Sequence, residues 1–334
     1  MRQAYIKPAA AIGTVAAAAT SALTLGPELQ APNAKAPTRP SHTTPRKSEA
    51  ARSGSHRARA RDNERMRGVS QALIEFANHH RQPPGPGIEI FDKERYRLVL
   101  QPDYPIPGPN GVGWIRCSAG EADEIIDEVH AAVAPRHLPI MWVTDPETEP
   151  PDFADYLARR GILPEPLAPA VDVMVLPIDA DISSRSVEGV EIHDALADAE
   201  TFRRADAVNA EAFEDPERAS HPDQLAMQER RRVNQLEAGN RRMLLVTVEG
   251  EPAGSAGLTL HPPHGAIITG GAVRKKFRGR GIYRTMVARR LEIAREAGAA
   301  GLSVWGGPMS APILAKLGFV PVGWRRFYLD TSTA

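Results

Sequence analysis

Two segments of the chain repeat one pattern at a separation of about one domain length. LARRGILP begins at Leu157 and LAKLGFVP begins at Leu314, and both place Leu, Ala, a cation, Gly, a bulky apolar residue and Pro in one register. Each segment also follows a strand-like run, a proline and a short helical run. A match this short can arise by chance, but the ordered recurrence of the preceding elements favours a true repeat. With about 150 residues per domain, a chain of 334 residues also fits two domains.

The first half of the chain has the elements of a small α/β domain. Ser118 and Glu121 form the pattern of a capping box, which opens a helix. The aliphatic residues on the inner face of this helix are Ile125, Ile126, Val129 and Val133. The other predicted elements are a helix from about Arg65, strands at 88–91, 96–100, 113–117 and 139–143, and a short helix that ends at 157–164.

The second half reads as a mixed α/β domain in the same way. Alternating and helical apolar spacing separates its strands from its helices. The predicted strands lie at 189–195, 242–250, 251–261, 265–273, 302–306 and 324–330. The predicted helices lie at about 198–213, 222–238 and 311–318, with a further helix that begins near Gly281 and ends at Gly298.

A loop rich in cations and glycine joins the strand at 265–273 to the helix that follows. It contains Arg274, Lys275, Lys276, Arg278, Arg280 and Arg284, with Gly279 and Gly281 among them. Unpaired N–H groups and the positive end of the helix dipole gather at such a helix start, and glycine lets a large anion approach. The loop therefore favours a phosphate or pyrophosphate ligand, and the alternative is a solvated, charged turn. The P-loop pattern and the dinucleotide fingerprint do not fit.

The residues of this loop resemble the GNAT acetyltransferase superfamily. The pyrophosphate motif of that family, [QR]-x-x-G-x-[GA], is matched by residues 278–283, except that Tyr283 replaces the final Gly or Ala. The family's LGF ending is matched by residues 317–319, and the order of elements fits over 189–334. The resemblance implies a splayed, mixed, mostly antiparallel sheet that holds acetyl-CoA. The cofactor-binding residues it implies are Ala272, Val273, Arg278, Gly279, Arg280, Gly281, Ile282, Tyr283 and Arg284.

The first half resembles a degenerate copy of the same fold. Glu121, Asp123 and Glu124 stand at its helix start, where the second half has arginines. Carboxylates suit a helix N-terminus but repel a pyrophosphate. We therefore expect a disordered tail or a mis-assigned start at 1–64, a GNAT-like domain without cofactor at 65–180, and the acetyl-CoA-binding domain at 181–334. The first half is expected to pack against the second and to shape the acceptor pocket.

The sequence departs from the family pattern at the positions that usually assist acetyl transfer. The family's usual general acid, a Tyr in the short helix before LGF, is Leu314 here, and the Asn often seen seven residues earlier is Gly307. Ser310 and Glu211 are the candidate substitutes, with a helix cap and a solvated carboxylate as the simpler interpretations. Transfer by proximity alone, with water taking the proton, is also possible.

Composition narrows the class of function. The formal net charge of zero disfavours a dedicated nucleic-acid-binding protein, although a cation-rich tail precedes residue 65. Cys117 is the single cysteine, so no internal disulfide forms and a reducing compartment is favoured. No metal-ligand spacing appears. The N-terminal alanine-rich run is a weak signal-peptide pattern that we disfavour, and a cytoplasmic location without membrane contact is expected.

These observations predict an enzyme that moves an acetyl group from acetyl-CoA to a primary amine. The alternative is a non-catalytic acyl-CoA-binding or sensing protein. The acceptor stays open among aminoglycosides, polyamines, amino acids, peptide N-termini and lysine side chains.

Overall fold

The computed structural model describes residues 68–182, 187–212 and 222–333. The predicted tail at 1–64 lies outside these residues. The helices are α2 (Gln71–His79), α3 (Ala122–Val133), α4 (Phe153–Arg159), α5 (Ala199–Ala212), α6 (Pro222–Ala238), α7 (Ile282–Glu296) and α8 (Ala311–Lys316). The strands are β1 (Glu89–Asp92), β2 (Arg97–Leu100), β3 (Gly111–Gly113), β4 (Ile140–Thr144), β5 (Leu163–Pro164), β6 (Ala170–Pro177), β7 (Val190–Asp194), β8 (Arg241–Val248), β9 (Glu251–His261), β10 (Gly265–Val273), β11 (Gly301–Gly306) and β12 (Val320–Asp330).

The strands form one mixed sheet in the order β1-β2-β3-β4-β12-β6-β11-β10-β9-β8-β7, with β5 beside β12. Strands β1 to β4 pair as antiparallel, antiparallel and parallel, and β8 to β11 repeat this sequence of directions. In each run a helix, α3 or α7, connects the two parallel strands. The mixed α/β class predicted from the sequence is therefore confirmed.

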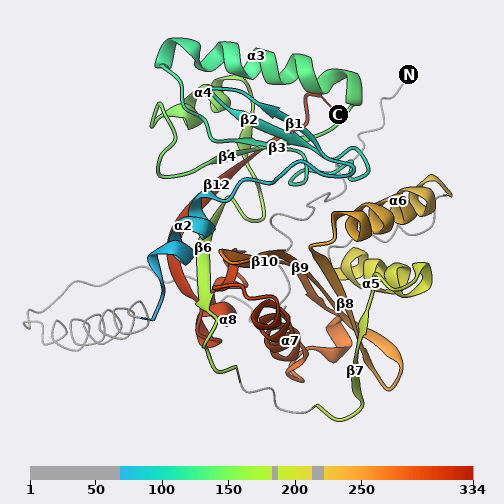
Figure 1. Cartoon of the computed structure of the whole chain (residues 1–334). Coiled ribbons are helices and arrows are strands. Elements are labelled where there is room, and N and C mark those ends of the chain that lie inside the picture. The colour runs from blue at the N-terminus through green and yellow to red at the C-terminus, as the bar shows by residue number, and fades with distance from the viewer. Residues whose placement is uncertain (1–67, 183–186, 213–221, 334) are drawn as a thin grey trace, which may run out of the picture.

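The two halves exchange their last strands. Strand β6 of the first half pairs with β11, and strand β12 of the second half pairs with β4. The two exchanged strands also pair with each other, antiparallel, between the halves (Figure 1). The sequence suggested one sheet per domain, whereas the structure joins the strands of both halves into one sheet. Residues 170–177, which belong to the predicted first domain, therefore pair with strands of the second half.

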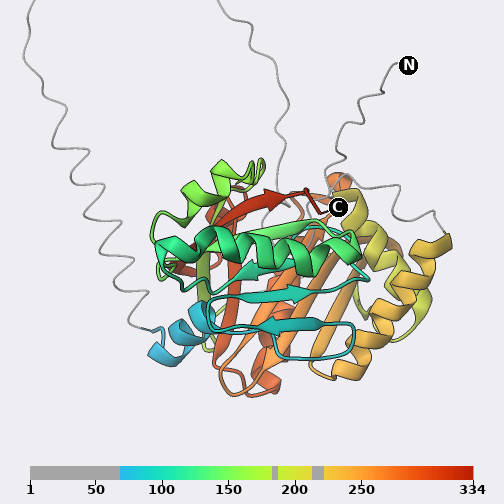
Figure 2. The ribbon, with the colours of Figure 1, turned by 90° about the horizontal axis from the view of Figure 1, so that it is seen from above.

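Local sequence explains α3 well, but one predicted strand is wrong and β6 was not predicted. The Ser118 amide donates to Glu121 Oε2 at 2.8 Å, as the capping box predicts, and the four predicted aliphatic residues of α3 are fully buried against β1–β4. Figure 2 shows α3 running along the direction of these strands. The predicted strand at 113–117 is wrong, because β3 ends at Gly113. Trp114 has a left-handed backbone (φ 56°), which interrupts the extended conformation.

Helices cover the two faces of the second-half strands in different ways. Helix α7 packs on β8–β11 through the predicted stripe of Met286, Val287, Leu291 and Ala294. Helix α5 packs on the opposite face, against the alternate side chains of β8, such as Met243 and Leu245. Helix α2 covers β6 on the same face as α5. Within the described residues, no helix is both long and apolar enough to cross a membrane.

Candidate functional site

Strands β10 and β11 separate at their carboxyl ends. They pair only at Ala266–Leu302 and Ile267–Ser303, although β10 continues to Val273. Beyond Thr269, β10 stays paired with β9 but carries a bulge before Ala272. The edge of β10 that faces away from β9 therefore exposes backbone donors and acceptors to the opening between the strands. This is the splay that the resemblance implies.

The predicted anion loop lies beside this opening. Gly279 and Gly281 have φ angles of 78° and 86°, a conformation that suits glycine. A Cβ on Gly279 would meet nothing within 4 Å, so this side of the loop is open. Gly281 is the N-cap of α7, whose first amides have no acceptor within the helix. The loop and helix start together fit a bound pyrophosphate.

Four cations of the loop have partners in the structure. Arg274 pairs with Glu211 at 2.8 Å, and Lys276 pairs with Glu251. Arg278 donates from Nε to the carbonyl oxygen of Val273 at 3.1 Å. The Arg280 guanidinium lies 5.7 Å from the centre of the Phe277 ring. These contacts connect the loop to α5, to β9 and to the end of β10.

The remaining predicted cofactor residues lie at the same place. The side chains of Ala272, Val273 and Ile282 are buried, so only their backbones can face the opening. Arg284 is half-buried in the first turn of α7. The Tyr283 ring lies under β10, and burial raises the pKa of its hydroxyl. The substitution of Tyr for the family's Gly or Ala therefore leaves the open side of the loop unchanged.

The candidate catalytic residues have different surroundings. Ser310 is 3% exposed, and its hydroxyl lies 3.5 Å from the carbonyl oxygen of Gly307, at the end of β11. Glu211 is half exposed and is engaged by Arg274. Leu314 is fully buried in the core against α7 and β11, so this position supplies no proton. The roles of Ser310 and Glu211 stay predictions.

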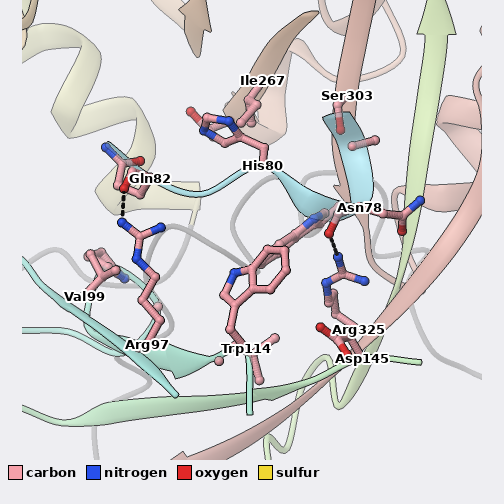
Figure 3. A pocket seen from close by; sticks show the side chains of 18 of the residues that line it. Asn78, His80, Gln82, Arg97, Val99, Trp114, Asp145, Ile267, Ser303 and Arg325 are labelled. Carbon is pink, nitrogen blue, oxygen red and sulfur yellow. Dashed lines mark hydrogen bonds between the residues drawn. The ribbon is translucent and has the colours of Figure 1, made fainter. Parts of the chain in front are cut away.

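A cavity of ≈ 280 Å³ opens on the sheet face opposite α7 (Figure 3). From the second half it is lined by Thr269 of β10 and by Ser303 and Trp305 of β11, at the point where these strands separate. From the first half it is lined by Arg97, Val99, Trp114 and Val143, on the face opposite α3. The cavity is therefore shared by the two halves and adjoins the splay.

The polar groups of this cavity were not predicted from the sequence. They include His80, Arg97, Trp114, Asp145 and Arg325, which come from distant parts of the chain. Burial, and then the positive charges of neighbours, lower the pKa of His80 to about 4, so its imidazole is neutral at pH 7. The Nε2 atom of His80 is buried without a hydrogen bond. None of these residues lies in a motif, so only their convergence in space identifies them.

The Asn209 side chain of α5 is a further polar group that sequence reasoning missed. Its Nδ2 donates to Ser255 Oγ at 3.3 Å, while its Oδ1 is buried without a partner. A Cβ on Gly270, in the bulge of β10, would lie 3.9 Å from this amide. The only available sequence signal was its position two residues before Glu211 on the same helix.

The helix start of the first half differs from that of α7. The Ser118 amide is already bonded to Glu121. Arg95 pairs with Glu121 at 3.3 Å, with Glu124 at 3.0 Å and with Glu128. The local cation is therefore shared by three carboxylates, and no glycine loop precedes α3.

Comparisons with known proteins agree with this geometry. Residues 205–319 match the model of the acetyltransferase (GNAT) family. A functionally unknown conserved protein from Staphylococcus epidermidis has 14% identity and a TM-score of 0.59, over 78% of this chain and 99% of that one. A GCN5-related N-acetyltransferase from Kribbella flavida has 18% identity and a TM-score of 0.54, over 85% and 96%. A tandem GNAT protein from the clavulanic acid biosynthesis pathway has 15% identity and a TM-score of 0.50, over 78% and 87%.

No curated protein matches the sequence. At these identities the solved structures establish the fold, which the chain shares over most of its length. Residues 205–319 form a GNAT acetyltransferase domain, as the loop motif predicts. Acyl transfer is the general activity of this family.

Proposed function

We propose that the protein transfers an acetyl group from acetyl-CoA to a primary amine. The observation that carries this proposal is the splay of β10 and β11 next to the glycine loop at the start of α7. The splay offers unpaired backbone groups to an extended chain, and the loop offers amides and guanidinium groups to a pyrophosphate. The splay and the loop lie next to each other, as required for a ligand that carries both an extended chain and a pyrophosphate.

Different parts of acetyl-CoA would bind to different residues of the second half. The pyrophosphate would lie on the amides of residues 279–284, with Arg278 and Arg280 supplying positive charge. The pantetheine amides would pair with the backbone of β10 at Ala272 and Val273. The thioester would then lie at the base of the splay, which adjoins the cavity at Thr269 and Ser303.

The chemistry needs a neutral amine. An alkyl ammonium with a pKa near 10.4 loses its proton at pH 7 at a free-energy cost of about 4–5 kcal/mol. The amine nitrogen attacks the thioester carbonyl carbon, the carbon–sulfur bond breaks, and the proton lost by nitrogen balances the one gained by the thiolate. Ser310 is our candidate donor at the thiolate, and water or Glu211 could remove the amine proton.

The first half would bind no second acetyl-CoA. Its helix start is capped by Glu121 and surrounded by carboxylates, so a pyrophosphate there would be repelled. We propose that this half is a degenerate GNAT copy that completes the acceptor cavity. A cytoplasmic location is part of the same proposal and is supported by the single cysteine.

The alternative is a protein that binds an acyl-CoA without turnover. It is favoured by Leu314, which removes the family's usual acid and is buried in the core. Release of free thiol from acetyl-CoA, dependent on an added amine, would exclude it.

Calorimetric titration of the full chain with acetyl-CoA tests the proposal first. We expect one site per chain with a dissociation constant near the micromolar range, about −8 kcal/mol. Two sites would show that the first half retains a cofactor site. Absence of binding would make the loop a solvated turn and would overturn the proposed function.

A further inference from the structure

Arg97 presents an undercompensated positive charge to the cavity shared by the two halves. Its side chain is 6% exposed, and one Nη donates to the carbonyl oxygen of Gln82. Its Nε is buried without a hydrogen bond. The only carboxylate close to this atom in the described residues is that of Asp92, which is 3.7 Å away and half exposed. Burial lowers the pKa of Arg97, as expected for a cation with little compensation.

Arg325 places a second guanidinium in the same cavity. It is also 6% exposed and donates to the carbonyl oxygens of Trp324 and Asn78. Asp145 is the negative charge that acts most strongly on Arg325, but Asp145 also lies 3.7 Å from Arg116. Burial lowers the pKa of Arg325.

The ionisable lining of the cavity is therefore mainly positive. Among the described lining residues it consists of Arg97, Arg325, the single carboxylate Asp145 and the neutral His80. His80 also faces the positive charge of Arg241, together with His261 and His264. Near Arg325, the further charged groups are Glu147 and Arg116, which form an ion pair with each other at 2.8 Å. A polycation entering this space would meet repulsion, whereas an anion would be attracted.

Trp114 gives the cavity a fixed apolar wall between these charges. Figure 3 shows its indole between Arg97 and Arg325. Its left-handed backbone is rare for a bulky residue, and Arg81 lies over the ring at 4.4 Å. The strained backbone and the stacked cation hold the indole toward the cavity.

We infer that the acetyl acceptor is a small amine that also carries a carboxylate or phosphate, and that Arg97 and Arg325 bind this anionic group. The inference rests on the proposed function. Guanidinium groups match the oxygens of both anions, and a cavity of ≈ 280 Å³ suits a small molecule. The amine would then reach the thioester past Thr269 and Ser303. Amino acids fit this chemistry, whereas polyamines and aminoglycosides do not.

Paired acceptors test the inference by measuring thiol release from acetyl-CoA. The pairs are β-alanine with propylamine and O-phosphoethanolamine with ethanolamine, so each differs in the anionic group. Spermidine and kanamycin serve as polycations. We expect kcat/KM to be at least tenfold higher for the anionic member of one pair, and that pair identifies the anion. Equal values within both pairs, or a preference for spermidine or kanamycin, would overturn the inference and leave acetyl transfer standing.

Variants separate the anion site from a general effect of charge. Arg97→Gln should abolish the preference within the pair by lowering kcat/KM for the anionic amine at least tenfold. Arg97→Lys should restore part of the preference, because it keeps the charge and loses the guanidinium fork. The control is Arg203→Gln, which removes an exposed arginine paired with Glu200 on α5. An unchanged preference in Arg97→Gln would contradict the assigned site.

Anion binding without acetyl-CoA keeps the two proposals distinguishable. Glutarate and inorganic phosphate should change the tryptophan fluorescence of the full chain, because Trp114 and Trp305 line the cavity, and Arg97→Gln should weaken this response at least tenfold. Such a response in a protein that binds no acetyl-CoA would overturn the proposed function and retain the anion site. Acetyl-CoA binding without any response to either anion would overturn the anion site.

Discussion

Arg278 binds the carbonyl oxygen of Val273 at 3.1 Å, and this bond joins the anion loop to the last residue of β10. The loop and the strand therefore keep a fixed relation at the mouth of the splay. A pyrophosphate bound at the loop would place the rest of its chain along β10. The geometry makes the loop and the strand one binding unit.

Gly281→Asp should weaken acetyl-CoA binding at least 100-fold in calorimetry. The substitution adds a negative charge at the helix start, where the pyrophosphate would lie. Gly281 has a φ of 86°, and a residue with a Cβ would adopt this angle at a cost of about 1 kcal/mol. Gly298→Asp is a matched control, because Gly298 has φ 76° and follows the other end of α7. Affinity equal to that of the parent in Gly281→Asp would refute the cofactor site.

Arg290→Met should lower the free energy of unfolding and raise KM for acetyl-CoA. Arg290 is 1% exposed and donates to the carbonyl oxygens of Gly257 and Thr269 at 3.2 and 3.4 Å, beside the bulge of β10. Loss of these bonds should cost about 1–3 kcal/mol in urea unfolding and raise KM for acetyl-CoA several-fold. Arg289→Met provides the control and should change neither quantity, because Arg289 is partly exposed and pairs with Glu292 on the outer side of α7. A stability loss with unchanged KM would show that Arg290 stabilises the core and does not support the cofactor site.

Acid should destabilise the protein through two buried histidines. The His80 and His261 rings lie 4.1 Å apart, and burial together with neighbouring charges lowers the pKa of each to about 4. Between pH 6.5 and 4 the unfolded chain binds more protons, so the free energy of unfolding falls as pH falls through this window and is unaffected above it. Their partial exposure limits the loss to on the order of 1 kcal/mol for each.

Urea unfolding at pH 7 and pH 5 measures this effect. The double variant His80→Gln/His261→Gln should lose less stability between the two pH values than the parent. His264→Gln is the control, since His264 is exposed. Parallel losses in the parent and in the double variant would show that other groups cause the acid sensitivity.

Ser310→Ala tests the candidate proton donor. If its hydroxyl protonates the thiolate, kcat should fall about 100-fold, while the dissociation constant of acetyl-CoA stays constant. A hydroxyl that only contacts the Gly307 carbonyl would leave kcat within twofold. Stopped assays of thiol release with a saturating amine separate these results.

Local patterns predicted the second half closely. Strands β9 and β10 have the predicted bounds, because strand alternation and a tight turn at 249–251 are encoded in adjacent residues. The anion loop was found in the same way, from a motif of six residues. Both features depend on interactions between near neighbours in the chain.

Long-range features were not accessible from the sequence. Pairing of β4 with β12 joins Thr144 to Arg326, and no periodicity specifies which apolar strand lies beside which. The cavity depends on that pairing, since Arg325 lies on β12 whereas Arg97 lies on β2. The contact between the rings of His80, which follows α2, and His261 was not predicted either. Each of these contacts required the tertiary fold.

The exchange of β6 and β12 also has a consequence for synthesis of the chain. The first half cannot complete its sheet until residues 320–330 have left the ribosome, because β4 pairs with β12. Contacts of such large sequence separation slow folding. During translation the free edge of β4 therefore stays open to other chains, and chaperone dependence of the nascent protein should end only with the last strand.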